Sequence, residues 1–268
     1  MEPDKQTEKA AFKMAGEIAG ERVGKRVGNM ARKMAGELTG GRSMYRKEFY
    51  IYGQDGRPVP AVIRNYREED FDGMIAIQQA CFPPPFPSEL WWNREQLQNH
   101  VALFSEGALC VEIEGQLAGS MTGLMVDFDP EHPDHTWAEV TDEGYIRNHK
   151  PEGNTLYVVD ISVAPSYRKL GLGKWLMFSM YEVVIQLGLE RLLGGGRMPG
   201  YHHHAASLSA EQYVQAVIQG ELKDPVLTFL LRCGRTPVKV VAGYLEDEES
   251  LNYGTLMEWR NPFKGVMK

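Results

Sequence analysis

The feature that most limits the fold of this chain is a long apolar run joined by a short basic loop to a second apolar segment. Residues 156–163 are almost continuously apolar, which is typical of a strand buried on both faces of a sheet. Pro165 ends this run, and residues 174–187 are apolar on most faces, as expected of a buried helix. This strand–loop–helix order predicts an α/β fold with the strand at the centre of a sheet.

The loop between these segments has the composition of an anion-binding site. It consists of Arg168, Lys169, Leu170, Gly171, Leu172 and Gly173. Glycines let the backbone come close to a ligand, and the free N–H groups and dipole at a helix start attract an anion. We therefore favour a pyrophosphate site over an ordinary glycine turn. A dinucleotide fingerprint would need glycine where Leu176 stands, and a Walker loop would need Ser or Thr where Trp175 stands.

The rest of the sequence completes a mixed α/β sheet with flanking helices. The patterns predict a hairpin at 49–52 and 59–63, helices at 71–80, from 88 past 101, at 210–218 and at 224–232, and strands at 109–113, 117–126, 191–193, 238–241 and 255–259. Ser88 is the expected N-cap of the second helix. A glycine-rich loop is expected after residue 193, and the polar segment 127–154 is long enough to be a functional lid.

The composition divides the chain into an extension, 1–42, and a main domain, 43–268. The extension carries nine Lys and Arg against six Asp and Glu, and Gly16, Gly20, Gly24 and Gly28 repeat at four-residue spacing. On a helix this spacing makes a stripe of small residues that another backbone can approach. Two interpretations stay open: a frayed extension, and a docking helix that supports a homodimer.

The charge and the cysteines narrow the classes of partner and the compartment. A net charge of -7 argues against a general nucleic-acid surface. No segment reaches the roughly 20 apolar residues that span a bilayer, so no membrane insertion is expected. Three widely spaced cysteines without a CxxC predict reduced thiols in a cytoplasmic protein. No spacing of His, Asp and Glu matches a metal loop, so no metal is expected.

At the loop the chain resembles the GNAT superfamily of N-acetyltransferases. Residues 163–173, VAPSYRKLGLG, are similar to the family signature [QR]-x-x-G-x-[GA] after a strand that ends in V-x-P-x-Y. The resemblance implies a splayed strand pair and acetyl-CoA as co-substrate. Its pantetheine arm would meet the backbone of Ile161, Ser162 and Val163, and its pyrophosphate the amides of Arg168, Lys169, Leu170, Gly171, Leu172, Gly173 and Lys174. Residues 195–201 and 224–234 resemble, more narrowly, the acetyltransferase half of proteins fused to a carbon–nitrogen hydrolase.

Two residues are candidates for proton transfer. Asp160 is the only acid on the central strand, where burial would raise its pKa and suit it to be a general base; a purely structural carboxylate is the alternative. Many family members place a Tyr, as general acid, where this chain has Leu230. Tyr201, in the loop after the short strand, is the substitute candidate, against a role in packing alone.

These expectations combine into direct acetyl transfer to a primary amine. The acceptor is a small molecule or a peptide, entering past residues 81–92, the acidic segment 127–154 and Tyr201. Because Leu230 replaces the usual acid, an acyl-CoA-binding regulatory module without turnover remains the alternative function.

Overall fold

The computed structural model describes residues 44–264, except residues 54 and 85. The expected extension, residues 1–42, lies outside the described residues. None of the described helices combines the length and the apolar character needed to cross a membrane. The main elements, in chain order, are β1 (Arg46–Tyr52), β2 (Pro58–Asn65), α2 (Phe71–Cys81), α3 (Arg94–Phe104), β3 (Ala108–Ile113), β4 (Gln116–Val126), α4 (Trp137–Thr141), β5 (Thr155–Val163), α5 (Leu172–Gln186), β6 (Arg191–Arg197), α6 (Ala210–Gln219), α7 (Pro225–Arg232), β7 (Thr236–Val241) and β8 (Gly254–Arg260).

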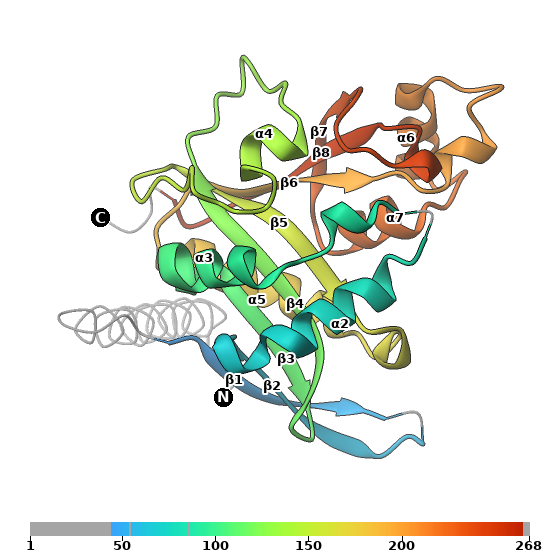
Figure 1. Ribbon diagram of the computed structural model, residues 1–268. Helices are drawn as coiled ribbons and strands as arrows, with labels where there is room; N and C mark the ends of the chain where they lie inside the picture. The colour runs from blue at the N-terminus through green and yellow to red at the C-terminus, as the bar shows by residue number, and fades with distance from the viewer. Residues whose placement is uncertain (1–43, 54, 85, 265–268) are drawn as a thin grey trace, which may run out of the picture. The chain divides into compact units, whose positions relative to one another are not determined.

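The strands form one mixed sheet, which confirms the expected fold class. Its order is β1-β2-β3-β4-β5-β6-β8-β7. Among these described strands, β5 and β6 form the one parallel pair. Helices α2 and α3 cover the face turned to the viewer in Figure 1, and α5 lies behind the sheet. The apolar run therefore becomes β5, a central strand whose residues 155–159 are buried.

Strands β5 and β6 are paired over only three residues and then separate. The pairs run from Thr155–Arg191 to Tyr157–Leu193, although β5 continues to Val163 and β6 to Arg197. In Figure 1 the two strands diverge towards the right of the picture. This separation confirms the expected splayed pair, and it leaves backbone groups of both strands without a sheet partner.

The glycine run after residue 193 is part of strand β6, so the expected loop at this position is wrong. All three glycines pair with β8 and face bulky neighbours. A Cβ on Gly195 would lie 2.1 Å from Cζ of Tyr244, and a Cβ on Gly196 would lie 2.7 Å from Leu230. Glycine in a strand often marks such a close approach. The sequence pattern was misleading because the signal for a turn and the signal for a tightly covered strand are the same residue.

The second helix begins later than expected. Ser88 lies in a short 3-10 turn, and α3 starts at Arg94 with Asn93 as its N-cap. Asn93 accepts a hydrogen bond from the backbone N–H of Gln96, whose side chain in turn accepts one from the N–H of Asn93. This reciprocal pair satisfies two N–H groups that the helix leaves free, whereas Ser88 has no such partner.

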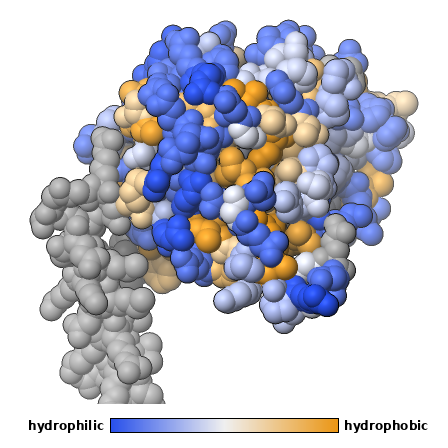
Figure 2. Space-filling view, turned by 60° about the horizontal axis from the view of Figure 1, so that its bottom comes forward, coloured by the Kyte–Doolittle hydropathy of each residue, from blue (hydrophilic) through white to orange (hydrophobic). Residues whose placement is uncertain are grey.

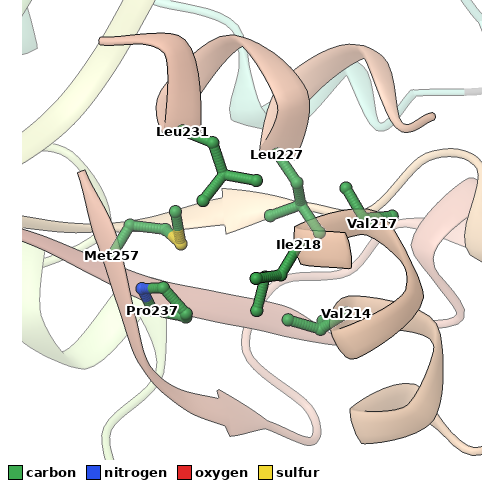
Figure 3. Close-up of a pocket in the computed structure, with 7 residues that line it drawn as sticks. All are labelled: Val214, Val217, Ile218, Leu227, Leu231, Pro237 and Met257. Atoms are coloured by element: carbon green, nitrogen blue, oxygen red, sulfur yellow. The ribbon is translucent and has the colours of Figure 1, made fainter. Parts of the chain in front are cut away.

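The last two helices attach to the far end of the sheet through an apolar seam (Figure 3). Side chains of α6 and α7 meet side chains of β7 and β8, with no room for a water molecule between them. The seam consists of Val214, Val217, Ile218, Leu227, Leu231, Pro237 and Met257. It is a packing contact that holds α7 behind β6 and carries no polar group for chemistry.

Replacing Gly195 by alanine should destabilise the fold strongly. The new methyl group would overlap the ring of Tyr244, and overpacking of this kind costs about 3 kcal/mol. Gly53→Ala, in the β1–β2 turn, is the matched change, because its nearest neighbour is the mobile end of Asp55 at 3.1 Å; it should cost less than about 1 kcal/mol. Urea unfolding of both variants measures the difference, and equal losses would contradict the close approach at Tyr244.

Candidate functional site

The loop before α5 presents a set of backbone N–H groups without protein partners. Lys169 and Gly171 have positive φ angles of 68° and 80°, which turn successive peptide groups towards one side. Within the described part of the chain, the N–H groups of residues 169–173 donate to no backbone acceptor. Around Gly171 no atom lies within 4 Å of a Cβ position. The loop thus has both the donors and the free space that an anionic group requires.

The exposed edge of β5 continues from this loop. Ala164 donates its N–H to Ala118 on β4. Because backbone groups alternate in direction along a strand, those of Ser162 also point to β4, whereas those of Ile161 and Val163 point away from it, to the side of the gap. The backbone of Ile161 and Val163 is therefore available to a ligand lying between β5 and β6.

Two side chains donate hydrogen bonds to the carbonyl of Val163, which faces the gap. Cys81, at the end of α2, donates from Sγ to this oxygen at 3.2 Å, and Arg168 donates from Nε at 3.3 Å. Burial raises the pKa of the Cys81 thiol, so the group is a neutral donor here. An extended amide-containing ligand could replace either donor, because Val163 O is not used by the sheet.

Asp160 lies on β5 beside this edge. Its Oδ2 accepts a hydrogen bond from Ser162 Oγ at 2.8 Å, and no basic group is among the influences on its titration. Burial raises the pKa of Asp160 to about 6, against the opposing effect of the hydrogen bonds from Ser162 and from the backbone of Ile161. A carboxylate with this pKa is suited to accept a proton near neutral pH.

A group of phenols lies where β5 and β6 separate. Tyr157 is the last residue of β5 that pairs with β6. Its hydroxyl shares a hydrogen bond of 2.7 Å with the hydroxyl of Tyr244. The N–H of Gly195 donates to the Tyr244 hydroxyl at 3.2 Å, and His135 Nε2 lies 2.9 Å from Tyr157 Oη. We call Tyr157, Tyr244 and His135 the vertex cluster. Sequence reasoning missed it; the glycine run opposite Tyr244 was the available signal.

The segment expected to be a lid joins β5 to the β7–β8 connection. Trp137, at the start of α4, donates from its indole to Val159 O on β5 at 3.0 Å and from its backbone N–H to Tyr244 O at 2.8 Å. Val159 itself has no partner on β4, because the register shifts between Thr122 and Gly123. The bridge thus holds a bulge of β5 and the β7–β8 connection at a fixed separation.

A polar pocket of about 300 Å³ lies on the outer side of the vertex cluster. Tyr157 and His135 belong to its wall, together with acidic residues of the segment 127–154. The acids and histidines among its lining residues are Asp127, Asp129, His132, Asp134, His135 and Glu139. Several of them are already paired, Asp127 with Lys150 and Asp134 with Lys239. His135 therefore borders a pocket with room for water molecules.

Tyr201 and Leu230 occupy positions in the core. The hydroxyl of Tyr201 donates to Leu208 O at 3.3 Å, and its ring packs against Tyr213 and Tyr253. No contact joins Tyr201 to Asp160 within the described residues. Leu230 is 4% exposed and packs on Gly196. The position at which the family resemblance implies an acid is thus filled by an apolar side chain that packs on β6.

The loop after α2 closes one side of the gap. The Arg197 guanidinium at the end of β6 lies over the rings of Phe82 and Phe86, with centroid distances of 5.7 and 5.4 Å. The same group forms a two-point ion pair with Asp247.

Figure 2 shows the lower end of the molecule brought forward, where a recessed apolar patch is bordered by hydrophilic side chains. Apolar and charged contacts are therefore both offered to an incoming molecule.

Comparisons with known proteins agree with these features. The model of the acetyltransferase (GNAT) family matches residues 71–205. An uncharacterized N-acetyltransferase of Bacillus subtilis, YkwB, is 60% identical over 218 residues, which cover 81% of this chain and 96% of the relative. A probable hydrolase of the same organism, YhcX, is 40% identical over 75% of this chain, but the match covers only 38% of its length. The second match agrees with the expected likeness to one half of a larger fused protein.

Two solved structures share the fold. The GNAT-like decarboxylase GphF in complex with isobutyryl-CoA has a TM-score of 0.65 at 24% identity, covering 74% of this chain and 98% of that one. The loading GNAT-like domain of CurA from Lyngbya majuscula has a TM-score of 0.65 at 21% identity, covering 75% and 98%. With the family match and the 60% identical relative, the chain belongs to the GNAT acetyltransferase family and is an N-acetyltransferase.

Proposed function

We propose that the chain transfers the acetyl group of acetyl-CoA directly to a primary amine of a small molecule or a peptide. The observation that supports this most is that two backbone segments adjoin each other. The N–H groups of residues 169–173 have no backbone acceptor among the described residues, and the backbone of Ile161 and Val163 faces the gap rather than β4. The first suits a pyrophosphate and the second an extended amide chain. Acetyl-CoA contains these two parts in this order and ends in the thioester.

The residues of the site divide into binding and proton-transfer roles. Arg168, Lys169 and Lys174 add positive charge around the amides of the loop, with Leu170, Gly171, Leu172 and Gly173 supplying backbone. Ser162 acts through its hydroxyl on Asp160. Asp160 takes a proton from the amine as its nitrogen attacks the thioester carbonyl, and Tyr201 remains a candidate donor to the leaving thiolate.

The experiment is a coupled test of binding and turnover on the full chain. Acetyl-CoA and isobutyryl-CoA are titrated by calorimetry, and thiol release is then followed with a panel of diamines, amino acids, aminoglycosides and peptide N-termini. We expect acetyl-CoA to bind and at least one amine to release free thiol with stoichiometric N-acetyl product. Absence of acyl-CoA binding would overturn the proposal, and a strong preference for isobutyryl-CoA would replace the acetyl group by a larger acyl group.

A regulatory module that binds acyl-CoA without turnover is the second candidate function. Leu230 favours it, since this buried apolar side chain takes the place of the usual acid. The same experiment separates the two: tight acetyl-CoA binding without thiol release for any amine supports the regulatory module.

Self-association through residues 1–42 is a separate proposal, since these residues lie outside the described part of the chain. Sedimentation of the full chain and of a chain starting at residue 43 tests it. A dimer mass that is lost on truncation supports the docking helix, and a monomer mass for both chains contradicts it.

A further inference from the structure

We propose that Tyr244 is the proton donor to the leaving thiolate and that Tyr157 and His135 resupply its proton from the polar pocket. This inference rests on the proposed acetyl transfer and assigns the acid that the chain lacks at Leu230. The supporting observation is the vertex cluster. Its three titratable side chains form one hydrogen-bonded row from the point where β5 and β6 separate to a pocket of about 300 Å³.

Tyr244 lies at the point where β5 and β6 separate. Its hydroxyl accepts a hydrogen bond of 3.2 Å from the Gly195 N–H, two residues beyond Leu193, the last residue of β6 that pairs with β5. A ligand that follows the free edge of β5 from Val163 through Ile161 is led towards this same point, since the gap closes at Tyr157. The Trp137 indole occupies Val159 O, the next carbonyl along this edge, and Tyr244 is 2% exposed. In the proposed complex the pantetheine arm takes the place of the indole, as it does of the donors at Val163 O, and its thioester then lies beside the Tyr244 hydroxyl.

A buried cation, Arg235, lies on the other side of the peptide group between Gly194 and Gly195. Arg235 is 3% exposed, and its Nη2 donates to Gly194 O at 3.3 Å and to Met257 O. Within the described residues its Nε has no partner, and the titratable groups acting on it are phenols and a thiol rather than a carboxylate. A buried cation without an anion is costly, so simple packing does not account for it.

Arg235 and Tyr244 are coupled through one peptide bond. Gly194 O accepts from Arg235, and the N–H of the same peptide group, on Gly195, donates to the Tyr244 hydroxyl. A cation at the oxygen polarises the N–H, and hydrogen bonds in such a row strengthen one another. The arrangement favours negative charge on the phenol oxygen and so opposes part of the rise in pKa that burial causes.

The protonation states agree with a donor. Burial raises the pKa of Tyr244 to about 12, while the hydrogen bonds from Tyr157 and Gly195 and the charge of Arg235 act in the opposite direction. Tyr244 thus carries its proton at neutral pH. Burial lowers the pKa of His135, with the Pro133 backbone, Glu139 and Asp134 opposing it, so the imidazole is neutral and able to exchange a proton with the pocket.

In the proposed transfer the amine nitrogen bonds to the acetyl carbon. The carbon–sulfur bond breaks, and its electron pair leaves on sulfur. The proton of Tyr244 passes to that sulfur to give the free thiol, and the excess proton of the new amide nitrogen passes to Asp160. Tyr244 then regains a proton through Tyr157 and His135 from solvent in the pocket, and Asp160 releases its proton to solvent.

The test compares phenol deletions in the full chain. Tyr244→Phe should lower kcat for thiol release about 100-fold, leave the KM for acetyl-CoA within about twofold, and diminish the solvent deuterium isotope effect on kcat. Tyr213→Phe is the matched control, because it also removes a buried hydroxyl, one that bonds Asp224, and it should keep wild-type kcat. A Tyr244→Phe chain with wild-type kcat, or a Tyr201→Phe chain that carries the loss instead, overturns the assignment.

A second variant tests the relay and does not depend on the folding of Tyr244→Phe. His135→Ala should lower kcat, and added imidazole should restore it in a concentration-dependent way, because the pocket has room for the base. Wild-type turnover in this variant, or a loss that imidazole does not change, overturns the relay. A wild-type chain that transfers no acetyl group overturns the proposed function itself, whereas an active wild type with unaffected variants overturns only this inference.

Discussion

Gly171→Glu should raise the Kd for acetyl-CoA by roughly 100-fold. Gly171 lies at the start of α5, where the N–H groups of residues 169–173 have no backbone acceptor among residues 44–264 as far as the structure describes them. A carboxylate about 5 Å from a bound phosphate would be repelled by ~3 kcal/mol at an effective dielectric constant of about 20, which is roughly a 100-fold loss of affinity. Titration calorimetry with acetyl-CoA measures the effect.

Gly188→Glu is the control for this change at the opposite end of the same helix. Gly188 has a φ of 64° against 80° for Gly171, and neither Cβ position has an atom within 4 Å. Both substitutions therefore carry a similar left-handed backbone cost, roughly 1–2 kcal/mol, and should lower Tm alike. Only Gly171→Glu should change acetyl-CoA affinity; equal affinities in the two variants would remove the phosphate from this loop.

The parts of the fold that follow from the sequence are those set by short-range patterns. Residues 156–163 become β5 because a continuous apolar run suits a strand covered on both faces. The loop at Gly171 and the helix after it follow from glycine, basic charge and an amphipathic period in adjacent segments. Asp160 could be chosen as a candidate because it is the one acid within that strand.

The remaining parts depend on contacts between distant segments. Tyr244 lies 87 residues from Tyr157 in sequence, yet their hydroxyls share a hydrogen bond. A pairing over this distance cannot be predicted from a local sequence pattern. The local pattern at Gly195 predicts a loop, because the ring that requires a glycine there comes from the β7–β8 connection. The local pattern at Ser88 predicts a helix start, whereas the helix begins after Asn93, whose cap depends on a reciprocal bond with Gln96.

Asp160→Asn should nearly abolish acetyl transfer and remove its acid limb. The pKa of Asp160 is about 6, so the carboxylate that accepts the proton forms as the pH rises from 5 to 7, and wild-type kcat/KM should rise over that interval. Loss of a general base costs about 100- to 1,000-fold in rate. Steady-state rates from pH 5 to 9 test this, and Asp72→Asn, at an exposed ion pair with Arg94, should keep the wild-type profile.

The same substitution should stabilise the fold, and this separates a catalytic carboxylate from a structural one. Because burial raises the pKa of Asp160 from 3.8 to about 6, the folded state binds this proton more tightly than the unfolded state. Its stabilising effect is complete below pH 4 and is lost as the pH rises through 6, a loss of at most about 3 kcal/mol. An asparagine carries no charge to desolvate, so at pH 8 the variant should unfold at higher urea concentration than the wild type. Lower stability together with lower activity would instead make Asp160 a structural residue whose carboxylate the fold requires.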